Sequence, residues 1–286
     1  MPPAPHPLAP LLVVSADLPG SVRPVMSLLT AMPELSADWC PLTDRRPLTY
    51  LIRHAAVLAA YVMPTATWDH DVMFRPPTAG APGEFFIEGF PEPGNVELET
   101  RSDTPLAVAM LRHNVAEYAN RLRERDDQRY FVEPTSRWAT NLLTMAGVEH
   151  RAILLVRDPR SELAEVWRGV RRNGCLPSPV THVDTPLAFA EREANWKYRE
   201  LLADLARPRS DGNQLVLRYE TLLADPNGTW ARLRAWLSLP TLPPPVLRPT
   251  LHEWPEARWR EILPAAVDDV CRQRMGNEMR AHGYAL

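Results

Sequence analysis

The sequence predicts an α/β protein with a parallel sheet that is covered by helices on both faces. The first observation is a series of short apolar stretches, rich in Val, Ile and Leu, that suit strands buried on both sides. The second is that helical patterns separate most of these stretches, which favours right-handed βαβ crossovers. The expected strands are Leu11–Ser15, Glu84–Glu88, Tyr130–Glu133, Ala152–Val156 and Leu215–Arg218.

The regions between the strands differ in regularity. Pro105–Arg123 carries apolar residues at helical spacing and is expected to form one helix. Residues 40 to 83 are rich in Pro and Trp and show no clear period, so we expect them to cover the carboxyl edge of the sheet. The Pro-rich residues 1 to 9 are expected to form a tail.

The turn after the fourth expected strand carries the first candidate for chemistry. The stretch "ILLVRDPRSELAEVWRG" places Arg157 directly after the apolar run, where open parallel sheets bind ligands. Asp158 can cap the following helix, and Pro159 suits its first turn. A guanidinium at this position fits a phosphate. It also fits a surface ion pair with an acid, and this stretch alone favours neither.

The composition of the chain limits the classes of function that it can have. The chain of 286 residues has a net charge of −3, which argues against general nucleic-acid affinity, and no apolar run approaches the length of a membrane span. The start lacks the basic region of a signal peptide. Three scattered cysteines form neither a disulfide framework nor a zinc motif, so we expect a cytoplasmic protein. Lys197 is the only lysine, so cationic chemistry depends on arginine, on Lys197 or on helix dipoles.

Three motifs in order point to one family. "LVLRYETLLADPNGTWARLRAWLSLP", Leu215–Pro240, resembles the "RYE-D-L-…-DP-…-L-…-FLGLP" segment of the PAPS-dependent sulfotransferases, especially the bacterial type. The stretch around Arg157 resembles the family's "hhxRDPRD" signature, in which h is apolar. The last residues, "ARWREILPAAVDDVCRQRMGNEMRAHGYAL", are similar to its closing "GRWR…L…M…LGY". The resemblance covers roughly residues 129 to 286.

The resemblance implies a fold, a donor and a set of contacts. The fold is a P-loop-type, sulfotransferase-like parallel sheet with helices on both faces. Residues 1 to 286 would form one such domain, with 40 to 125 on the acceptor side. The donor would be PAPS, 3′-phosphoadenosine 5′-phosphosulfate, and the acceptor a hydroxyl or amine of a small molecule. The implied donor contacts are Gly20, Ser21 and Arg23 at the phosphosulfate, and Arg157, Ser161 and Arg258 at the 3′-phosphate.

The implied catalytic residues are Arg23, as the cation at the leaving group, and a base. Glu133 lies at the expected carboxyl end of its strand and is one candidate for the base. His70 is the other, because Asp69 and Asp71 flank it in the irregular region. The same pattern around His70 also suits a solvated loop.

The chain departs from the family pattern at three donor contacts. The residue eight places after Arg157 is Glu165 where the family has a serine, and a carboxylate there repels a phosphate. In the first loop the family's cation is replaced by Leu18, and Asp17 adds a negative charge. On the third expected strand "EPTS" replaces "EKTP", so Pro134 stands in place of a lysine.

Two hypotheses follow. In the first, the chain is a sulfotransferase whose donor site is rebuilt around arginine. In the second, it keeps the fold but has lost PAPS binding, and serves as a binding protein or a different enzyme. A small-molecule kinase fits less well, since the lysine and an acidic strand end of the Walker B type are missing. The first hypothesis predicts that Arg157, Ser21 and Arg23 converge on one cleft. The second predicts that side chains fill that cleft, or that Glu165 and Asp17 point into it. Neither hypothesis involves nucleic acid or a membrane.

Overall fold

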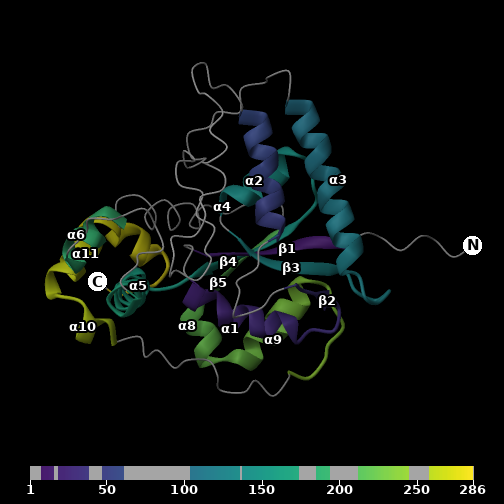
Figure 1. The fold of residues 1–286 in the computed structure, drawn as a ribbon. Helices are drawn as coiled ribbons and strands as arrows, with labels where there is room; N and C mark the ends of the chain where they lie inside the picture. The colour runs from purple at the N-terminus through teal and green to yellow at the C-terminus, as the bar shows by residue number, and fades with distance from the viewer. Residues whose placement is uncertain are drawn as a thin grey trace, which may run out of the picture.

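The core of the molecule is a five-stranded sheet in which all neighbouring strands run parallel (Figure 1). The computed structural model describes residues 8–15, 19–38, 47–60, 104–135, 137–173, 185–193, 212–244 and 258–285. The strand order is β2-β3-β1-β4-β5. The strands are β1 (Ala9–Val14), β2 (Leu35–Ser36), β3 (Tyr130–Thr135), β4 (Arg151–Val156) and β5 (Gln214–Arg218). The predicted parallel α/β fold is confirmed.

Helices follow the strands in the expected alternation. They are α1 (Pro19–Thr30), α2 (Pro47–Ala60), α3 (Thr104–Leu122), α4 (Arg137–Met145), α5 (Pro159–Asn173), α6 (Pro186–Glu193), α8 (Tyr219–Ala224), α9 (Pro226–Trp236), α10 (Trp259–Ile262) and α11 (Ala265–Ala281). The helix predicted over Pro105–Arg123 corresponds to α3. Four of the five predicted strands are present, and Glu84–Glu88 lies outside the described residues. Strand β2 was not predicted, because two residues are too few for a pattern.

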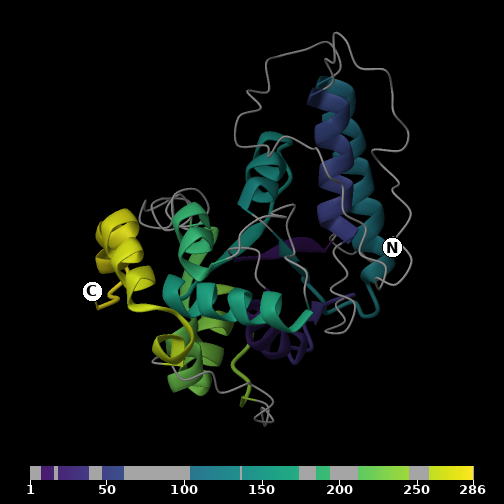
Figure 2. The same cartoon turned by 60° about the vertical axis from the view of Figure 1, so that its left-hand side comes forward.

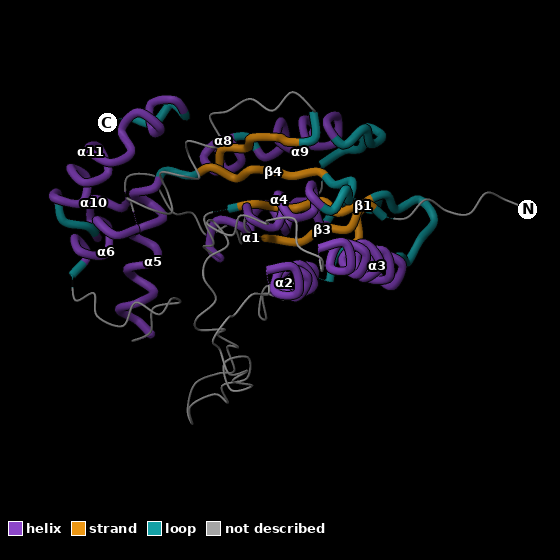
Figure 3. The backbone as a smooth tube through the Cα atoms, turned by 90° about the horizontal axis from the view of Figure 1, so that it is seen from above, coloured by secondary structure: helices purple, strands orange, loops and turns teal. Residues whose placement is uncertain are grey.

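Alternation along the strands divides the core into two layers. Leu11 and Val13 of β1 face α1, α8 and α9, whereas Leu12 and Val14 face the other layer, with α2 to α6, α10 and α11. Figure 1 shows α1, α8 and α9 below the sheet and α2, α3 and α4 above it, with α5, α6, α10 and α11 gathered on the left. Figures 2 and 3 show the same arrangement from two further sides. Burial of both sheet faces explains the continuous apolar runs in the sequence.

The topology singles out the carboxyl ends of β1 and β4. The two strands are neighbours, and Val14 lies beside Leu154 in their register. Helix α1 leaves β1 toward one layer, while α5 leaves β4 toward the other. Open α/β sheets bind their ligands where adjacent strands send their helices to opposite faces. The predicted donor contacts after β1 and after β4 therefore flank the position that this topology favours for a ligand.

Membrane-spanning helices and metal-binding clusters are both absent from the residues that the structure describes. None of the helices in the described ranges is long and apolar enough to cross a lipid bilayer. Within the same part of the chain, no group of three or more His, Cys, Asp or Glu residues is placed to hold a metal ion. Cys271 is a free, buried thiol, and Cys40 and Cys175 fall outside the described ranges.

Candidate anion-binding site at the end of strand β4

The turn between β4 and α5 is built as the sequence suggests. Helix α5 begins at Pro159, whose fixed φ suits a first helical position. The Asp158 carboxylate accepts a hydrogen bond from the Arg160 backbone N–H, with Oδ1 and N 2.9 Å apart. This contact satisfies one of the orphan donors at the start of the helix, so the predicted cap is confirmed. The turn holds Arg157 at the carboxyl end of β4.

Arg157 is buried and already holds a carboxylate. Its Nη1 donates to Oε2 of Glu165 across 2.5 Å, and Glu165 lies two turns into α5. The guanidinium carbon lies 4.5 Å from the centre of the Tyr219 ring, at the start of α8. Burial disfavours the charged guanidinium, but the carboxylates of Glu165 and Glu162 outweigh it and raise the pKa of Arg157. Glu165 is thus bound to the guanidinium that the resemblance assigns to the 3′-phosphate of the donor.

Arg160, three residues further on, has a denser set of partners. Its guanidinium donates to both oxygens of Asp158, to Oδ1 of Asp268 at 3.0 Å and to the carbonyl of Ala285 at 2.8 Å. The Trp259 ring centre lies 4.8 Å from its guanidinium carbon. Burial opposes the charge here too, and Asp158 and Asp268 together raise the pKa of Arg160. The side chain fastens the end of the chain to the start of α5.

Glu220, in the helix that follows β5, also takes part in the joint, by which we mean the contacts between the Asp158 turn, the start of α8 and the end of the chain. Its Oε1 accepts the backbone N–H of Asp158 at 2.9 Å, and its Oε2 accepts the Tyr284 hydroxyl at 3.0 Å. The Arg218 guanidinium carbon lies 4.6 Å from the centre of the Tyr284 ring. The three sequence motifs on which the resemblance rests therefore meet in space. Much of their shared pattern encodes the joint between β4, β5 and the end of the chain.

Glu133, predicted as a candidate base, caps a helix. Its carboxylate is 2% exposed and accepts the backbone N–H groups of Leu48 and Thr49 at 2.9 and 2.8 Å, as well as the Thr49 hydroxyl at 3.1 Å. These donors lie at the start of α2, where a negative charge also suits the helix dipole. The sequence analysis did not predict this structural role. A catalytic role for Glu133 stays a prediction.

Known structures resemble the chain over almost its whole length. One is a sulfotransferase from Alicyclobacillus acidocaldarius, at 11% identity and a TM-score of 0.50, covering 97% of both chains. Another is the sulfotransferase domain from the Synechococcus PCC 7002 olefin synthase, at 16% identity and a TM-score of 0.50, covering 100% of this chain and 98% of that one. The chain has the sulfotransferase fold. No protein-family model and no curated protein matches the sequence.

Within this sulfotransferase fold, the remaining predicted donor contacts fall at several places. Gly20 and Ser21 belong to the first turn of α1, which begins at Pro19. Arg23 is exposed one turn further on. Ser161 is buried in the first turn of α5. Arg258 precedes α10 and forms an ion pair with Glu261 at 3.5 Å. His70, Asp17 and Leu18 lie outside the described residues.

Two residues near Arg157 were not singled out from the sequence. Tyr219 follows β5, and the register of β4 and β5 places Val156 beside Arg218, so the next residues along both strands lie close. This register could have predicted the contact. Glu162 acts on Arg157 through its charge from the first turn of α5 and is 3% exposed. Its role depends on the side-chain direction within α5, which the sequence pattern alone does not specify.

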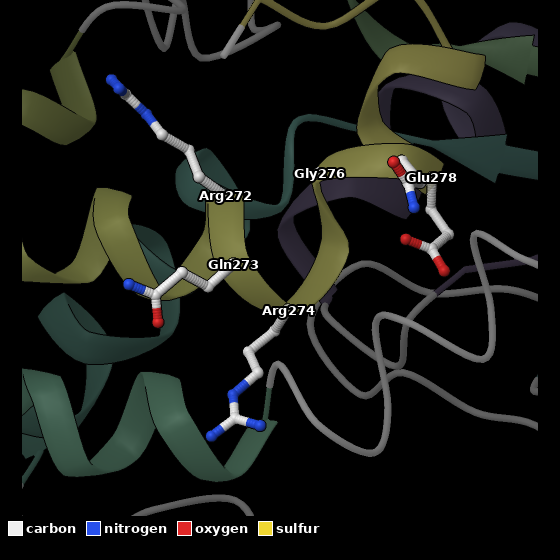
Figure 4. A pocket seen from close by; sticks show the side chains of 6 residues that line it. Arg272, Gln273, Arg274, Gly276 and Glu278 are labelled. Carbon is white, nitrogen blue, oxygen red and sulfur yellow. The ribbon is translucent and has the colours of Figure 1, made fainter.

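A second polar feature lies on α11. It is a depression of about 210 Å³ lined by Arg272, Gln273, Arg274, Gly276, Asn277 and Glu278. Figure 4 shows that the labelled side chains fan out from the helix and do not converge on one point. Arg272 is also paired with Asp268 one turn earlier. None of the sequence-predicted donor contacts lines this depression.

Proposed function

We propose that this chain is a sulfotransferase-like enzyme that transfers a sulfuryl group from a nucleotide phosphosulfate to a small-molecule hydroxyl or amine. PAPS is the donor that the sequence resemblance implies. The acceptor oxygen or nitrogen forms a bond to sulfur while the bridging S–O bond to the phosphate breaks. A base takes the acceptor proton, and the nucleotide leaves with the electron pair of the broken bond. No step requires an oxidant or a reductant.

The observation that carries the proposal is the position of Arg157. A buried arginine, stacked on an aromatic ring, closes the strand beside β1 in a sulfotransferase fold. Its carboxylate partner Glu165 is one-third exposed. Arginine suits phosphate groups because its planar fork donates two parallel hydrogen bonds. In the proposed function a nucleotide phosphate reaches Arg157 once the Glu165 carboxylate moves aside.

Strand β3 lacks a cationic residue that the resemblance implies for catalysis. Pro134 lies on β3 in the position that the resemblance gives to a lysine, and it pairs in register with Val13 of β1. Loss of one preorganised contact to developing charge lowers a rate by about 10²–10³. We therefore expect slow turnover unless another cation, such as Arg23, assists the leaving group.

A second candidate function is favoured by the ion pair between Arg157 and Glu165. In this alternative the chain keeps the sulfotransferase fold without a phosphosulfate donor, and serves as a binding protein or a different enzyme at the same strand ends. The ion pair would then be a permanent structural contact, and no nucleotide would compete for Arg157.

Calorimetric titration with two nucleotides tests the proposal. The probes are 3′-phosphoadenosine 5′-phosphate, which PAPS leaves behind, and adenosine 5′-phosphate (AMP), which a donor without the 3′-phosphate leaves behind. We expect one of them to bind in the micromolar range, and Arg157→Gln to weaken that binding at least about tenfold. Arg125→Gln is the matched control, because Arg125 is exposed and paired only locally with Asp127. Binding of neither nucleotide at millimolar concentration to the folded protein would favour the second candidate.

A further inference from the structure

The charge around Arg157 differs from what a 3′-phosphate requires. The guanidinium of Arg157 is already bound to the carboxylate of Glu165, at 2.5 Å. A phosphate dianion entering this site would meet that carboxylate as well as the guanidinium. Inside a protein such repulsion is far stronger than in water. The carboxylate does not repel a neutral hydroxyl group.

The side chains of Arg157 and Glu165 differ in their exposure to solvent. The Arg157 side chain is 2% exposed, whereas that of Glu165 is 34% exposed. A ligand that arrives from solvent therefore reaches the carboxylate before it reaches the guanidinium. A carboxylate accepts hydrogen bonds and cannot donate them, so it suits a hydroxyl group on the ligand. Its hydrogen bond to Arg157 fixes one of its two oxygens.

A carboxylate at such a position is a known means of nucleotide discrimination. In dinucleotide-binding folds an acidic residue accepts the ribose hydroxyl of one cofactor, and arginine accommodates the phosphorylated form of the other. Here both side chains are present, but the carboxylate has already neutralised the arginine. The physical consequence for a ribose 3′ position is the same as in those folds.

We propose that Glu165 makes this site select a nucleotide with a free ribose 3′-hydroxyl over one with a 3′-phosphate. The activated donor of that class is a nucleoside 5′-phosphosulfate with an unsubstituted ribose. The inference rests on the proposed function, since it requires a nucleotide at the end of β4. It assigns that nucleotide to a chemical class different from that of PAPS.

The ratio of two affinities tests the inference in the wild-type protein. AMP is expected to bind at least about tenfold more tightly than 3′-phosphoadenosine 5′-phosphate at moderate salt. The ratio should shrink as salt is raised, because screening weakens the repulsion. An equal or tighter affinity for the 3′-phosphorylated nucleotide would overturn the inference and leave PAPS as the donor. Binding of neither nucleotide would overturn both the inference and the proposed function.

Three variants separate charge from shape. Glu165→Ser restores the family's hydroxyl, removes the carboxylate that binds Arg157 and should reverse the preference toward the 3′-phosphorylated nucleotide. Glu165→Gln keeps the length and the acceptor oxygen without the charge, so it should bring the two affinities within about threefold of each other. Glu117→Ser, an exposed change on α3 with the same loss of charge, should leave the ratio as in the wild type. An unchanged ratio in Glu165→Ser, with the protein folded by circular dichroism, would show that Glu165 does not set the preference.

Discussion

Arg157 and Arg160 stand three residues apart in one turn and differ in how they are held. Both are buried, and each lies over an aromatic ring, Tyr219 for Arg157 and Trp259 for Arg160. Arg160 donates to two carboxylates and to a backbone carbonyl near the end of the chain. Arg157 donates to the carboxylate of Glu165, which lies on α5 and is one-third exposed.

The difference lies in where the carboxylate partners of the two arginines come from. Two partners of Arg160, Asp268 and Ala285, come from distant parts of the sequence, so its loss would weaken the contact between α5 and the end of the chain. Glu165, which binds Arg157, lies eight residues away on α5 and is partly exposed. Arg160 thus has the contacts of a structural cation, whereas for Arg157 the proposed function assigns a role in binding.

The largest effect expected from this comparison is on the stability of Arg160→Ala. The variant leaves Asp158 and Asp268 without their buried partner, and breaking a buried ion pair typically costs about 3–5 kcal/mol. Urea unfolding followed by tryptophan fluorescence measures the loss. The control Arg125→Ala removes an exposed arginine and should leave the free energy of unfolding unchanged within error. A loss as small as that of the control would contradict the structural role of Arg160.

A smaller effect is expected for Glu165→Gln, which tests the other half of the comparison. The glutamine oxygen still accepts from Arg157, and the replaced carboxylate is one-third exposed, so solvent screens the lost charge. The free energy of unfolding should change by less than about 1 kcal/mol, although the nucleotide preference changes. A loss comparable to that of Arg160→Ala would mean that Arg157 and Glu165 form a structural pair with no exchangeable partner.

The sequence predicts the fold well because the sheet is buried on both faces. Apolar runs such as Ile153–Val156 and the turn after them are local signals, and the cap at Asp158 follows from residue type alone. Strand β2 is missed because two residues carry no periodicity. The position of β1 at the centre of the sheet depends on crossovers between distant segments, which local patterns do not encode.

The candidate site is harder to predict, because its chemistry depends on which side chains meet. Glu165 is recognisable from its spacing to Arg157, and the repulsion it offers to a phosphate follows from charge alone. That it binds Arg157 directly is visible only once α5 is placed against the end of β4. The cap made by Glu133 joins residues about 85 positions apart, a contact that no local pattern reveals.

The smallest expected effect is on the pH dependence of the free energy of unfolding, and a variant of Glu220 tests it. Burial raises the pKa of the Glu220 carboxyl above its usual 4.5, although the Asp158 N–H and Tyr284 hydroxyl oppose this. A raised folded-state pKa contributes stability that is fully present below 4.5 and is lost as pH rises through the folded pKa. Glu220→Gln, which keeps an acceptor for Asp158, should therefore gain stability relative to the wild type as pH rises from about 4 to about 7.

Asp268→Asn provides the comparison of opposite sign. Burial alone would raise the pKa of Asp268, but its bonds to Arg160 and Arg272 hold it below the usual 3.8. Its contribution is present above that value and is lost as pH falls through the folded pKa. The stability of this variant relative to the wild type should therefore fall as pH rises out of the acid range. Urea unfolding at several pH values measures both slopes, and slopes of equal sign would contradict the assignment of Asp268 as a paired carboxylate and Glu220 as a desolvated one.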